Sequence, residues 1–353
     1  MTKLRIGVIG AGSIAAAHLD AYAAHPDVEL IAVADINLDR ARAVADRYGA
    51  ARAYDDAHDL LAADDIDGVS ICTWNDTHAV WATAAIEAGK HVLVEKPLSR
   101  TVAEALAVEQ AAAASDRVVQ VGFVRRHSPN CQVLKSFIDA GELGEMYYAK
   151  ASLIRRVGNP GGWFAQKDIA GGGPLLDIGI HVLDLAWYLM GAPKAVTVSG
   201  NTYDVLGNRA NITTMPRYQV SDYDPTKNSV EDMANAVIRF EGGASLMLDS
   251  SYSLHATRDS IGVSVYGDKG GADLEPDLHI ATEMHDSVVN ITPQISSGSF
   301  ELGKAFTNEI ANFVDAGLGR AESVAPVGHG LEIVKILEAI YASAQDGREV
   351  QLG

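Results

Sequence analysis

The chain has 353 residues, of which 48% are hydrophobic, so it is long and apolar enough for two domains with cores of their own. Its formal charge at pH 7 is −18, which argues against nucleic-acid binding as a main activity, because that activity needs clustered lysine and arginine. Cys72 and Cys131 have neither zinc-site nor disulfide spacing, and we see no apolar run of membrane length. We therefore expect a cytoplasmic protein without a metal site and without a nucleic-acid or membrane partner.

Residues 1–122 contain short apolar runs that alternate with helical segments. The runs are 4–9, 28–34, 68–73, 91–95 and 118–122, and the helical segments are 13–25, 37–48, 77–88 and 101–115. Continuously apolar strands that alternate with helices are typical of a parallel sheet covered on both faces. The pattern predicts an α/β, Rossmann-type, doubly wound parallel sheet over residues 1–122.

The pattern changes over residues 123–353. A helix is predicted at 129–140, a strand at 146–156, a helix at 175–190, strand-like runs between 194 and 282, and two final helices at 301–317 and 329–345. Glu241-Gly242-Gly243 is a hairpin signal, and 204–230 is expected to be a polar surface excursion. These elements predict an α+β C-terminal domain with a large, mostly antiparallel open sheet over residues 123–353, to which the family resemblance described below assigns substrate binding and oligomerisation.

The first apolar run leads into Gly10-Ala11-Gly12-Ser13-Ile14-Ala15, which fits the dinucleotide pattern G-x-G-x-x-(G/A) in its strand-to-helix context. Gly10 permits a tight turn, Gly12 lets a pyrophosphate approach the backbone, and the helix N-terminus stabilises phosphate charge. Asp35 ends the second run, where a carboxylate accepts both ribose hydroxyls of NAD and repels the 2′-phosphate of NADP. We expect NAD as the cofactor, with NADP less favoured.

Residues 91–98 read HVLVEKPL, which places Lys96 at the carboxyl end of a strand, where ligands bind in such sheets. Pro97 restricts the backbone of Lys96, so its side chain is aimed. A lysine there can hydrogen-bond a substrate oxygen and stabilise developing negative charge. The alternative is a solvated surface lysine.

Residues 171–191 read GGGPLLDIGIHVLDLAWYLMG, an apolar segment with three polar residues in step. In a helix, Asp177, His181 and Asp184 lie on one stripe. The residues alone favour a structural interpretation, with Asp177 in the first turn and His181 in the core. Asp184 is interpreted as structural, and the glycines 171–173 are expected to let the backbone pass close to a ligand.

Together these segments resemble the glucose–fructose oxidoreductase/inositol dehydrogenase (Gfo/Idh/MocA) family over essentially the whole chain. The residues that carry the resemblance are Gly10, Gly12, Thr73-Trp74-Asn75, His78, the run from Ala88 to Pro97, Gly122-Phe123, Arg125-Arg126, Gly172-Gly173, Asp177, Gly179, His181 and the ending from Gly347. Trp74 is a departure, since the family usually has proline there.

The resemblance implies an NAD-dependent dehydrogenase that oxidises a secondary hydroxyl of a sugar or of a cyclic polyol such as an inositol. Lys96, Asp177 and His181 match the catalytic group, in which Lys96 holds the reacting oxygen and Asp177 binds a neighbouring hydroxyl or raises the basicity of His181. A histidine titrates in the range that a general base needs. Whether His181 or Lys96 first accepts the proton stays open.

The expected cofactor contacts are Gly10, Gly12, Ser13, Ile14, Asp35, Ile36, Arg40, Thr73, Trp74, Asn75, His78, Glu95 and Lys96. The expected substrate contacts are Lys96, Arg126, Trp163, Asp177 and His181. Arg126 has a domain-interface ion pair as its alternative, and Trp163 a subunit contact.

Three other functions compete with this interpretation: a glycosidase-like cycle on bound NAD, a ketosugar reductase that runs the reverse direction, and a non-catalytic NAD sensor. The sensor is disfavoured because Lys96, Asp177 and His181 are all present. The open sheet also predicts a homo-oligomer, because its second face needs a cover, and the family resemblance implies a homodimer or homotetramer.

Overall fold

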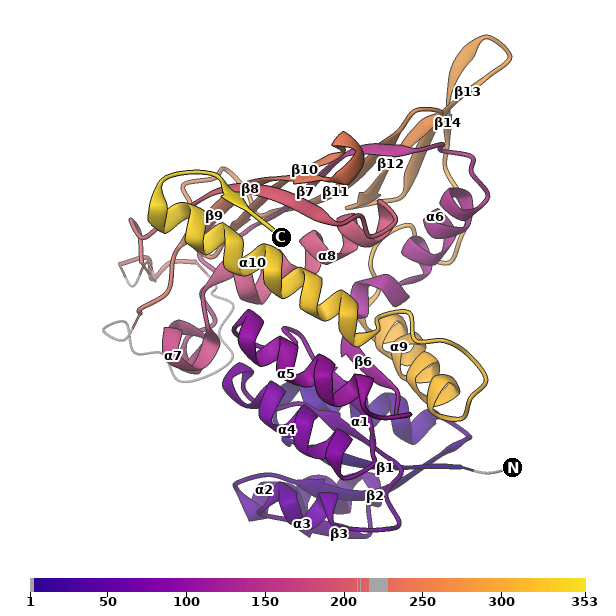
Figure 1. Ribbon diagram of the computed structural model, residues 1–353, viewed down its shortest axis with the longest axis vertical. Coiled ribbons are helices and arrows are strands. Elements are labelled where there is room, and N and C mark those ends of the chain that lie inside the picture. The colour runs from indigo at the N-terminus through magenta and orange to yellow at the C-terminus, as the bar shows by residue number, and fades with distance from the viewer. Residues whose placement is uncertain (1–2, 208, 210, 216–227) are drawn as a thin grey trace. The chain divides into compact units, whose positions relative to one another are not determined.

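A computed structural model describes residues 3–207, 209, 211–215 and 228–353 (Figure 1). The chain forms two compact units: unit 1 consists of Met1–His127 and Leu302–Leu331, and unit 2 of Ser128–Glu301 and Glu332–Gly353. The sequence-based division after residue 122 differs from this, because it assigned 123–127 and 302–331 to the second domain. Much of the predicted excursion at 204–230 lies outside the described residues.

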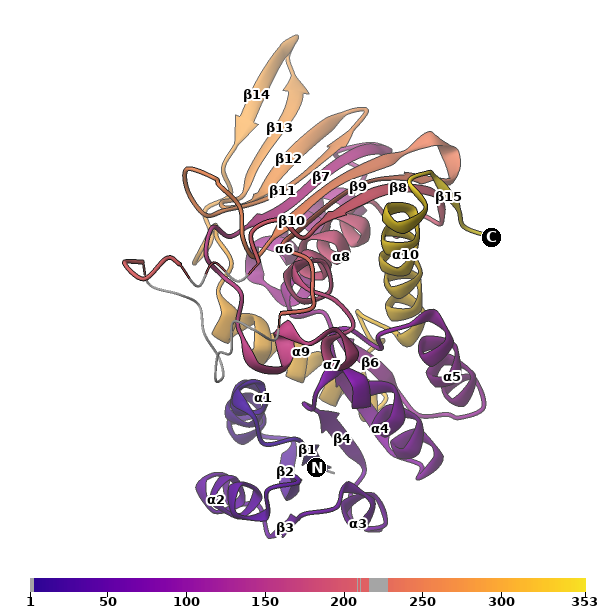
Figure 2. The same cartoon turned by 90° about the vertical axis from the view of Figure 1, so that its left-hand side faces the viewer.

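Unit 1 contains a sheet of six parallel strands in the order β3-β2-β1-β4-β5-β6, which confirms the predicted doubly wound fold. The strands are β1 Leu4–Ile9, β2 Val28–Ala34, β3 Arg52–Tyr54, β4 Gly68–Ile71, β5 His91–Glu95 and β6 Val119–Gly122. The helices between them are α1 Ser13–Ala24, α2 Leu38–Tyr48, α3 Ala57–Leu61, α4 Asn75–Glu87 and α5 Val102–Ala113. Helices α1 and α2 lie on one face and α4 and α5 on the other (Figure 2).

A late segment of the chain completes the core of unit 1. Helix α9, Leu302–Gly317, packs against α1 and against the short helix η1, Val124–His127. Its buried residues Ile310, Phe313 and Val314 join the apolar cluster beneath α1. Helix 301–317 was predicted correctly, but its apolar face belongs to the core of unit 1, where burial removes that face from water.

Unit 2 is built on a nine-stranded sheet in the order β14-β13-β12-β11-β7-β10-β9-β8-β15, antiparallel except for the pair β7–β10. The strands are β7 Met146–Ile154, β8 Ala195–Tyr203, β9 Met233–Phe240, β10 Ser245–Ser251, β11 Ser260–Gly267, β12 Gly270–Glu275, β13 His279–Met284, β14 Ser287–Ile291 and β15 Val350–Gln351. The hairpin predicted at Glu241–Gly243 connects β9 to β10. The mostly antiparallel sheet is thus confirmed.

The helices of unit 2 lie on one face of this sheet, as Figure 2 shows for α6 Pro129–Asp139, α8 Ile180–Leu189 and α10 Val327–Asp346. Helix α10 approaches β8 closely, because a Cβ on Gly200 would lie 2.8 Å from Ile340 Cγ2. The Ser343 hydroxyl also accepts a hydrogen bond from the Gly200 amide at 2.9 Å. The opposite face of the sheet carries no helix among the described residues.

The predicted helix at 175–190 differs in one respect from a regular α-helix. Its first turn, η3 Leu175–Gly179, is a π-helix, and α8 begins only at Ile180. Before it lie η2 Gly162–Ala165 and α7 Lys167–Ala170. By length and composition, the stretch Lys167–Leu189 could cross a membrane, so the expectation that no apolar run has membrane length is wrong. However, 78% of its most apolar window is buried, as in the core helix of a soluble protein.

Candidate active site

The glycine loop of unit 1 has the geometry of a dinucleotide cradle. Gly10 has a φ of +91°, and a Cβ there would lie 2.6 Å from the carbonyl oxygen of Cys72, so only glycine fits. A Cβ on Gly12 would meet nothing within 4 Å, which leaves open space in front of the first amides of α1. Gly12 and Ser13 are both exposed. The loop therefore fits a pyrophosphate at the helix N-terminus.

Asp35 is fixed at the end of β2 by backbone groups. Its Oδ2 accepts a hydrogen bond from the Ala11 amide and its Oδ1 one from the Asn37 amide, both at 2.8 Å. Arg40 Nη1 lies 3.6 Å from Oδ2, and Ile36 is 84% exposed. Each carboxylate oxygen keeps a second acceptor site, so the carboxylate can still accept the ribose hydroxyls.

Lys96 is the only residue of 91–99 whose side chain is not buried. It follows directly on β5, at the carboxyl edge of the parallel sheet. Its backbone amide donates to Glu95 Oε2 at 3.2 Å. The sequence-based placement of a lysine at a strand end is therefore confirmed, whereas its role in chemistry stays a prediction.

The other predicted cofactor residues of unit 1 divide by exposure. Trp74 is 45% exposed at the N-terminus of α4, and Thr73 is partly exposed. Asn75, His78 and Glu95 are buried. The ring nitrogens of His78 lie 2.7 Å from the Pro97 carbonyl oxygen and 3.2 Å from that of Thr73, so this ring ties two protein loops together.

Asp177 and His181 are the only residues of 172–187 that are not buried. Asp177 lies in the π-helical turn, where its Oδ2 accepts a hydrogen bond from the Tyr252 hydroxyl at 2.7 Å. Burial and the Asp177 carboxylate raise the pKa of Tyr252 well above its ordinary value, which keeps the hydroxyl a donor. Asp184 is 1% exposed, as its structural interpretation predicted.

Glu231, which sequence reasoning missed, holds the start of this helix. Its carboxylate accepts hydrogen bonds from the Gly173 amide at 2.9 Å, the Leu175 amide at 3.3 Å and the Tyr341 hydroxyl at 2.8 Å. Burial raises the pKa of Glu231, and these hydrogen bonds oppose the rise. No spacing signal could have found this residue, because it lies 58 positions from Gly173.

Two glycines before the helix are required by protein contacts within unit 2. A Cβ on Gly172 would lie 2.0 Å from the Tyr341 hydroxyl, and one on Gly173 would lie 2.6 Å from the Glu231 carbonyl oxygen. From the sequence, these glycines were expected to let the backbone pass close to a ligand. Among the described residues, it is the close approach of Tyr341 and Glu231 that leaves no room for a side chain at these positions.

The two weaker substrate candidates have protein partners. Arg126 is 2% exposed, and its Nη1 donates to the carbonyl oxygen of Val324 and to His329 Nδ1, each at 2.8 Å. Trp163, in η2, stacks on Phe164 with ring centroids 3.8 Å apart. These contacts favour a structural role for Arg126 and leave Trp163 as a prediction.

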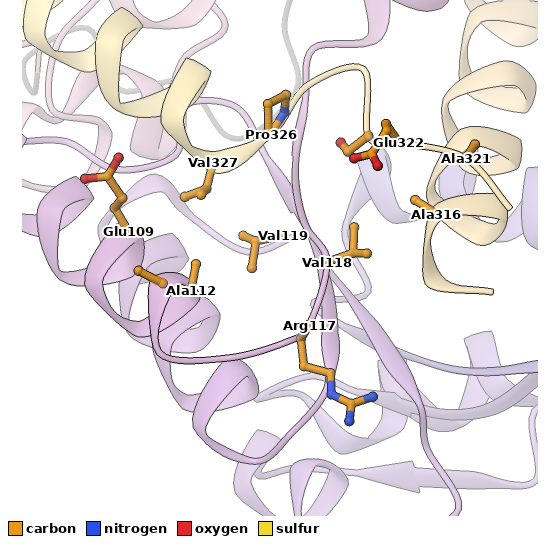
Figure 3. Close-up of a pocket in the computed structure, with 12 residues that line it drawn as sticks. Glu109, Ala112, Arg117, Val118, Val119, Ala316, Ala321, Glu322, Pro326 and Val327 are labelled. Atoms are coloured by element: carbon orange, nitrogen blue, oxygen red, sulfur yellow. The ribbon is translucent and has the colours of Figure 1, made fainter. Parts of the chain in front are cut away.

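Unit 1 also contains a pocket of about 350 Å³ between α5, β6 and residues 316–327 (Figure 3). Apolar side chains such as Val119 and Val327 line it, with Glu109, Arg117 and Glu322 at its edge. None of the predicted site residues contributes to it. Among the residues that the structure describes, no group of three or more His, Cys, Asp or Glu could hold a metal ion.

The histidine next to Arg126 gives unit 1 a testable acid sensitivity. Burial and the Arg126 charge lower the pKa of His127 to about 3, whereas an unfolded histidine titrates near about 6.5. As the pH falls below that value, the unfolded state binds a proton that the folded state refuses, so the free energy of unfolding decreases. At pH 5 this amounts to about 2 kcal/mol. The exposed fraction of His127 is 1%, so solvent screens this effect little.

We therefore expect His127→Leu to lose less stability than the parent protein between pH 7 and pH 5, by about 2 kcal/mol in urea unfolding. His279→Ala, which removes an exposed histidine in unit 2, is the matched control and should follow the parent. Parallel loss in all three proteins would show that His127 is protonated without penalty.

The fold and the site define the class of protein. A Rossmann sheet with an open glycine loop and an acid after its second strand is an NAD-binding oxidoreductase domain, and residues 4–123 match the family described as "Oxidoreductase family, NAD-binding Rossmann fold". Residues 131–273 match the "GFO/IDH/MocA C-terminal domain". The chain belongs to the GFO/IDH/MocA oxidoreductase family, which confirms the resemblance and the expected NAD.

Named relatives align with most or nearly all of this chain. It is 35% identical to the D-glucoside 3-dehydrogenase of Escherichia coli K12, over 99% of this chain and 98% of that protein. It is 32% identical to the levoglucosan dehydrogenase of Pseudarthrobacter phenanthrenivorans, over 76% of this chain and 73% of that protein. A solved levoglucosan dehydrogenase in complex with NADH and L-sorbose superposes with a TM-score of 0.87, at 26% identity and 100% coverage of both chains.

Proposed function

We propose that this protein is an NAD-dependent dehydrogenase that oxidises a secondary hydroxyl of a sugar or cyclic polyol, with a D-glucoside as the first candidate. The observation that carries the proposal is selective exposure: Lys96 within 91–99, and Asp177 and His181 within 172–187, are the residues left partly exposed in otherwise buried segments. Polar groups that stay accessible where everything around them is buried are candidates for ligand contact. Named glucoside, levoglucosan and inositol dehydrogenases among the relatives support the substrate class.

Each of these residues has its own role in the proposed reaction. Bound NAD, held by the glycine loop and Asp35, would supply the acceptor for the hydride of the substrate carbon. Either His181 takes the hydroxyl proton while the ammonium of Lys96 stabilises negative charge on the reacting oxygen, or a neutral Lys96 takes the proton itself. Asp177, oriented by the Tyr252 hydroxyl, binds a neighbouring hydroxyl of the ring. The same groups serve the reverse direction.

The test is formation of NADH, followed by absorbance, when the purified protein is mixed with NAD and a panel of glucosides, levoglucosan, inositols and sugar acids. Turnover on one ring class supports the proposal and names the substrate. Without turnover on any member, NADH oxidation by ketosugars would favour a reductase. Tight, non-exchanging NAD with cleavage of a glycoside would favour the glycosidase-like cycle.

Cofactor preference gives a second prediction, at Asp35. Asp35→Ser with Ile36→Arg removes the carboxylate that repels a 2′-phosphate and adds a cation near Arg40, so the ratio of kcat/KM for NADP over NAD should rise by about 10- to 100-fold. Asp35→Asn is the control, because it removes the charge without adding a cation; its one amide oxygen keeps an acceptor for the Ala11 amide and gives up the one for the Asn37 amide. An unchanged ratio in the double variant would mean that the ribose is recognised elsewhere.

We also propose a cytoplasmic homodimer or homotetramer. The helix-free face of the unit 2 sheet carries Met247, 45% exposed, beside Tyr148, whose ring stacks on Tyr266 with centroids 5.6 Å apart. Exposed apolar side chains on a sheet face gain stability when a second copy covers them.

A further inference from the structure

A chain of buried polar side chains lies beneath the Lys96 loop of unit 1. The Tyr22 hydroxyl is 2.8 Å from Ser70 Oγ, and Ser70 Oγ is 3.1 Å from His18 Nδ1. The other ring nitrogen of His18, Nε2, is 2.8 Å from Glu95 Oε1. His18 and Ser70 are 0% exposed and Glu95 is 6% exposed. The chain thereby connects α1, β4 and β5.

His18 and Glu95 form a buried hydrogen-bonded pair in which both pKa shifts favour the charged forms. Burial alone lowers the pKa of His18, but Cys72 and Glu95 raise it well above its ordinary value. Burial raises the pKa of Glu95, but the hydrogen bond and the charge of His18 bring it below its ordinary value. Desolvation makes a buried ion pair a poor source of stability, and apolar residues of equal volume often serve as well or better. A contribution to stability therefore does not explain why a histidine and a glutamate occupy these two buried positions.

The contact made by the second carboxylate oxygen of Glu95 suggests another role for the pair. While Oε1 faces His18, Oε2 accepts the backbone amide of Lys96 at 3.2 Å. Gly122 on the neighbouring strand leaves room for this arrangement, since a Cβ there would lie 3.3 Å from Glu95 Cδ. The carboxylate of Glu95 thus links His18 to the backbone amide of Lys96.

The loop is held on its other side as well. The carbonyl oxygen of Pro97 lies 2.7 Å from His78 Nδ1, the shorter of the two carbonyl contacts of this ring, and it accepts a hydrogen bond when Nδ1 carries the proton. Two hydrogen bonds therefore hold the backbone around Lys96. In one, the Lys96 amide donates to Glu95, and in the other, the Pro97 carbonyl oxygen accepts from His78. The hydrogen bond to Glu95 depends on His18 of α1, and the hydrogen bond to Pro97 depends on His78 of α4.

We propose that His18, acting through Glu95, is a positioning residue for Lys96. The proposal rests on the proposed function insofar as Lys96 takes part in the chemistry. His18 fixes the rotamer of Glu95, Glu95 fixes the amide of Lys96, and the lysine side chain is thereby aimed at the reacting oxygen. A displacement of about 1 Å at such a group lowers the rate of the chemical step by about 100-fold.

Two uncharged variants of the same residue separate this role from packing. A glutamine amide reaches the position of the histidine Nε2 and keeps a donor for Glu95, whereas the shorter asparagine reaches only the side of Nδ1 and Ser70. We expect His18→Asn to lower kcat about 10- to 100-fold with KM for NAD within about twofold, and His18→Gln to keep kcat within about threefold. Equal kcat values for the two variants would overturn the proposal.

Leu19→Ala is the matched control, because Leu19 is buried in the same helix and packs in the apolar core. It should lower the melting temperature without lowering kcat. If His18→Asn does not fold, Glu95→Gln takes its place: its single amide oxygen accepts from His18 or from the Lys96 amide but not from both, so kcat should again fall. An unchanged kcat in that variant would also overturn the proposal.

A readout without turnover keeps the proposal separate from the proposed function. Pro97 has no amide hydrogen, so hydrogen exchange in a peptide covering 95–98 reports mainly on Lys96 and Leu98. Exchange should accelerate about tenfold in His18→Asn and remain near that of the parent in His18→Gln. Faster exchange in a protein that oxidises no sugar would support the positioning role while the proposed function fails. Unchanged exchange with full activity would reject the positioning role alone.

Discussion

His181→Ala is expected to lower kcat by about 10²- to 10⁴-fold, the range that a positioned general base contributes. The NAD affinity should stay within about twofold, because the cofactor motif belongs to unit 1 and His181 to unit 2. Steady-state kinetics on the substrate found by the panel, together with NADH binding followed by fluorescence, measure both quantities. If His181 takes the proton, the pH profile of kcat/KM should also lose its acidic limb in this variant.

His279→Ala is the matched control for the loss of an imidazole in unit 2, since His279 is exposed on β13. It should keep the activity of the parent protein. A His181→Ala variant that binds NAD poorly while its kcat is retained would remove His181 from the chemistry. A variant with low kcat and an unchanged pH profile would assign the proton to Lys96.

The sequence predicted those parts of the fold in which the local pattern has one physical solution. Gly10 must adopt a positive φ, and the apolar runs from Leu4 to Gly122 can be satisfied only in a sheet covered on both faces. The same holds for the position of Lys96, because a residue that ends a parallel strand lies at the ligand edge. In these cases neighbours along the chain determine the structure.

The rest depends on residues far apart in the chain. The π-helical turn at Leu175–Gly179 ends where Gly179 meets Ser250, with a Cβ there only 2.9 Å from Ser250 Cβ. Glu231 caps that turn from the loop that precedes β9, and α9 fills the core of unit 1 from nearly 300 residues beyond β1. Periodicity carries no information about such partners, so neither the turn nor the partner of His18 could be predicted.

Lys96→Ala is expected to lower kcat/KM by about 10²- to 10³-fold, because the variant loses a preorganised cation next to the oxygen that becomes negative in the transition state. The free energy lost is about 3–4 kcal/mol, which is too large for a solvated surface lysine. Lys96→Arg keeps the charge but changes its position, so it should recover only part of the rate. Kinetics on both variants at several pH values measure the effect.

Lys3→Ala, at an exposed lysine of the same unit, is the matched control and should keep full activity. Substrates deuterated at the oxidised carbon sharpen the test, because loss of charge stabilisation slows the chemical step and should bring out a primary isotope effect on kcat. Activity of Lys96→Ala equal to that of the parent would return Lys96 to the surface-lysine interpretation and, with it, remove the purpose assigned to His18 and Glu95. If kcat falls in Lys96→Ala and falls by a smaller factor in His18→Asn, the buried pair of His18 and Glu95 acts on the same chemical step as Lys96.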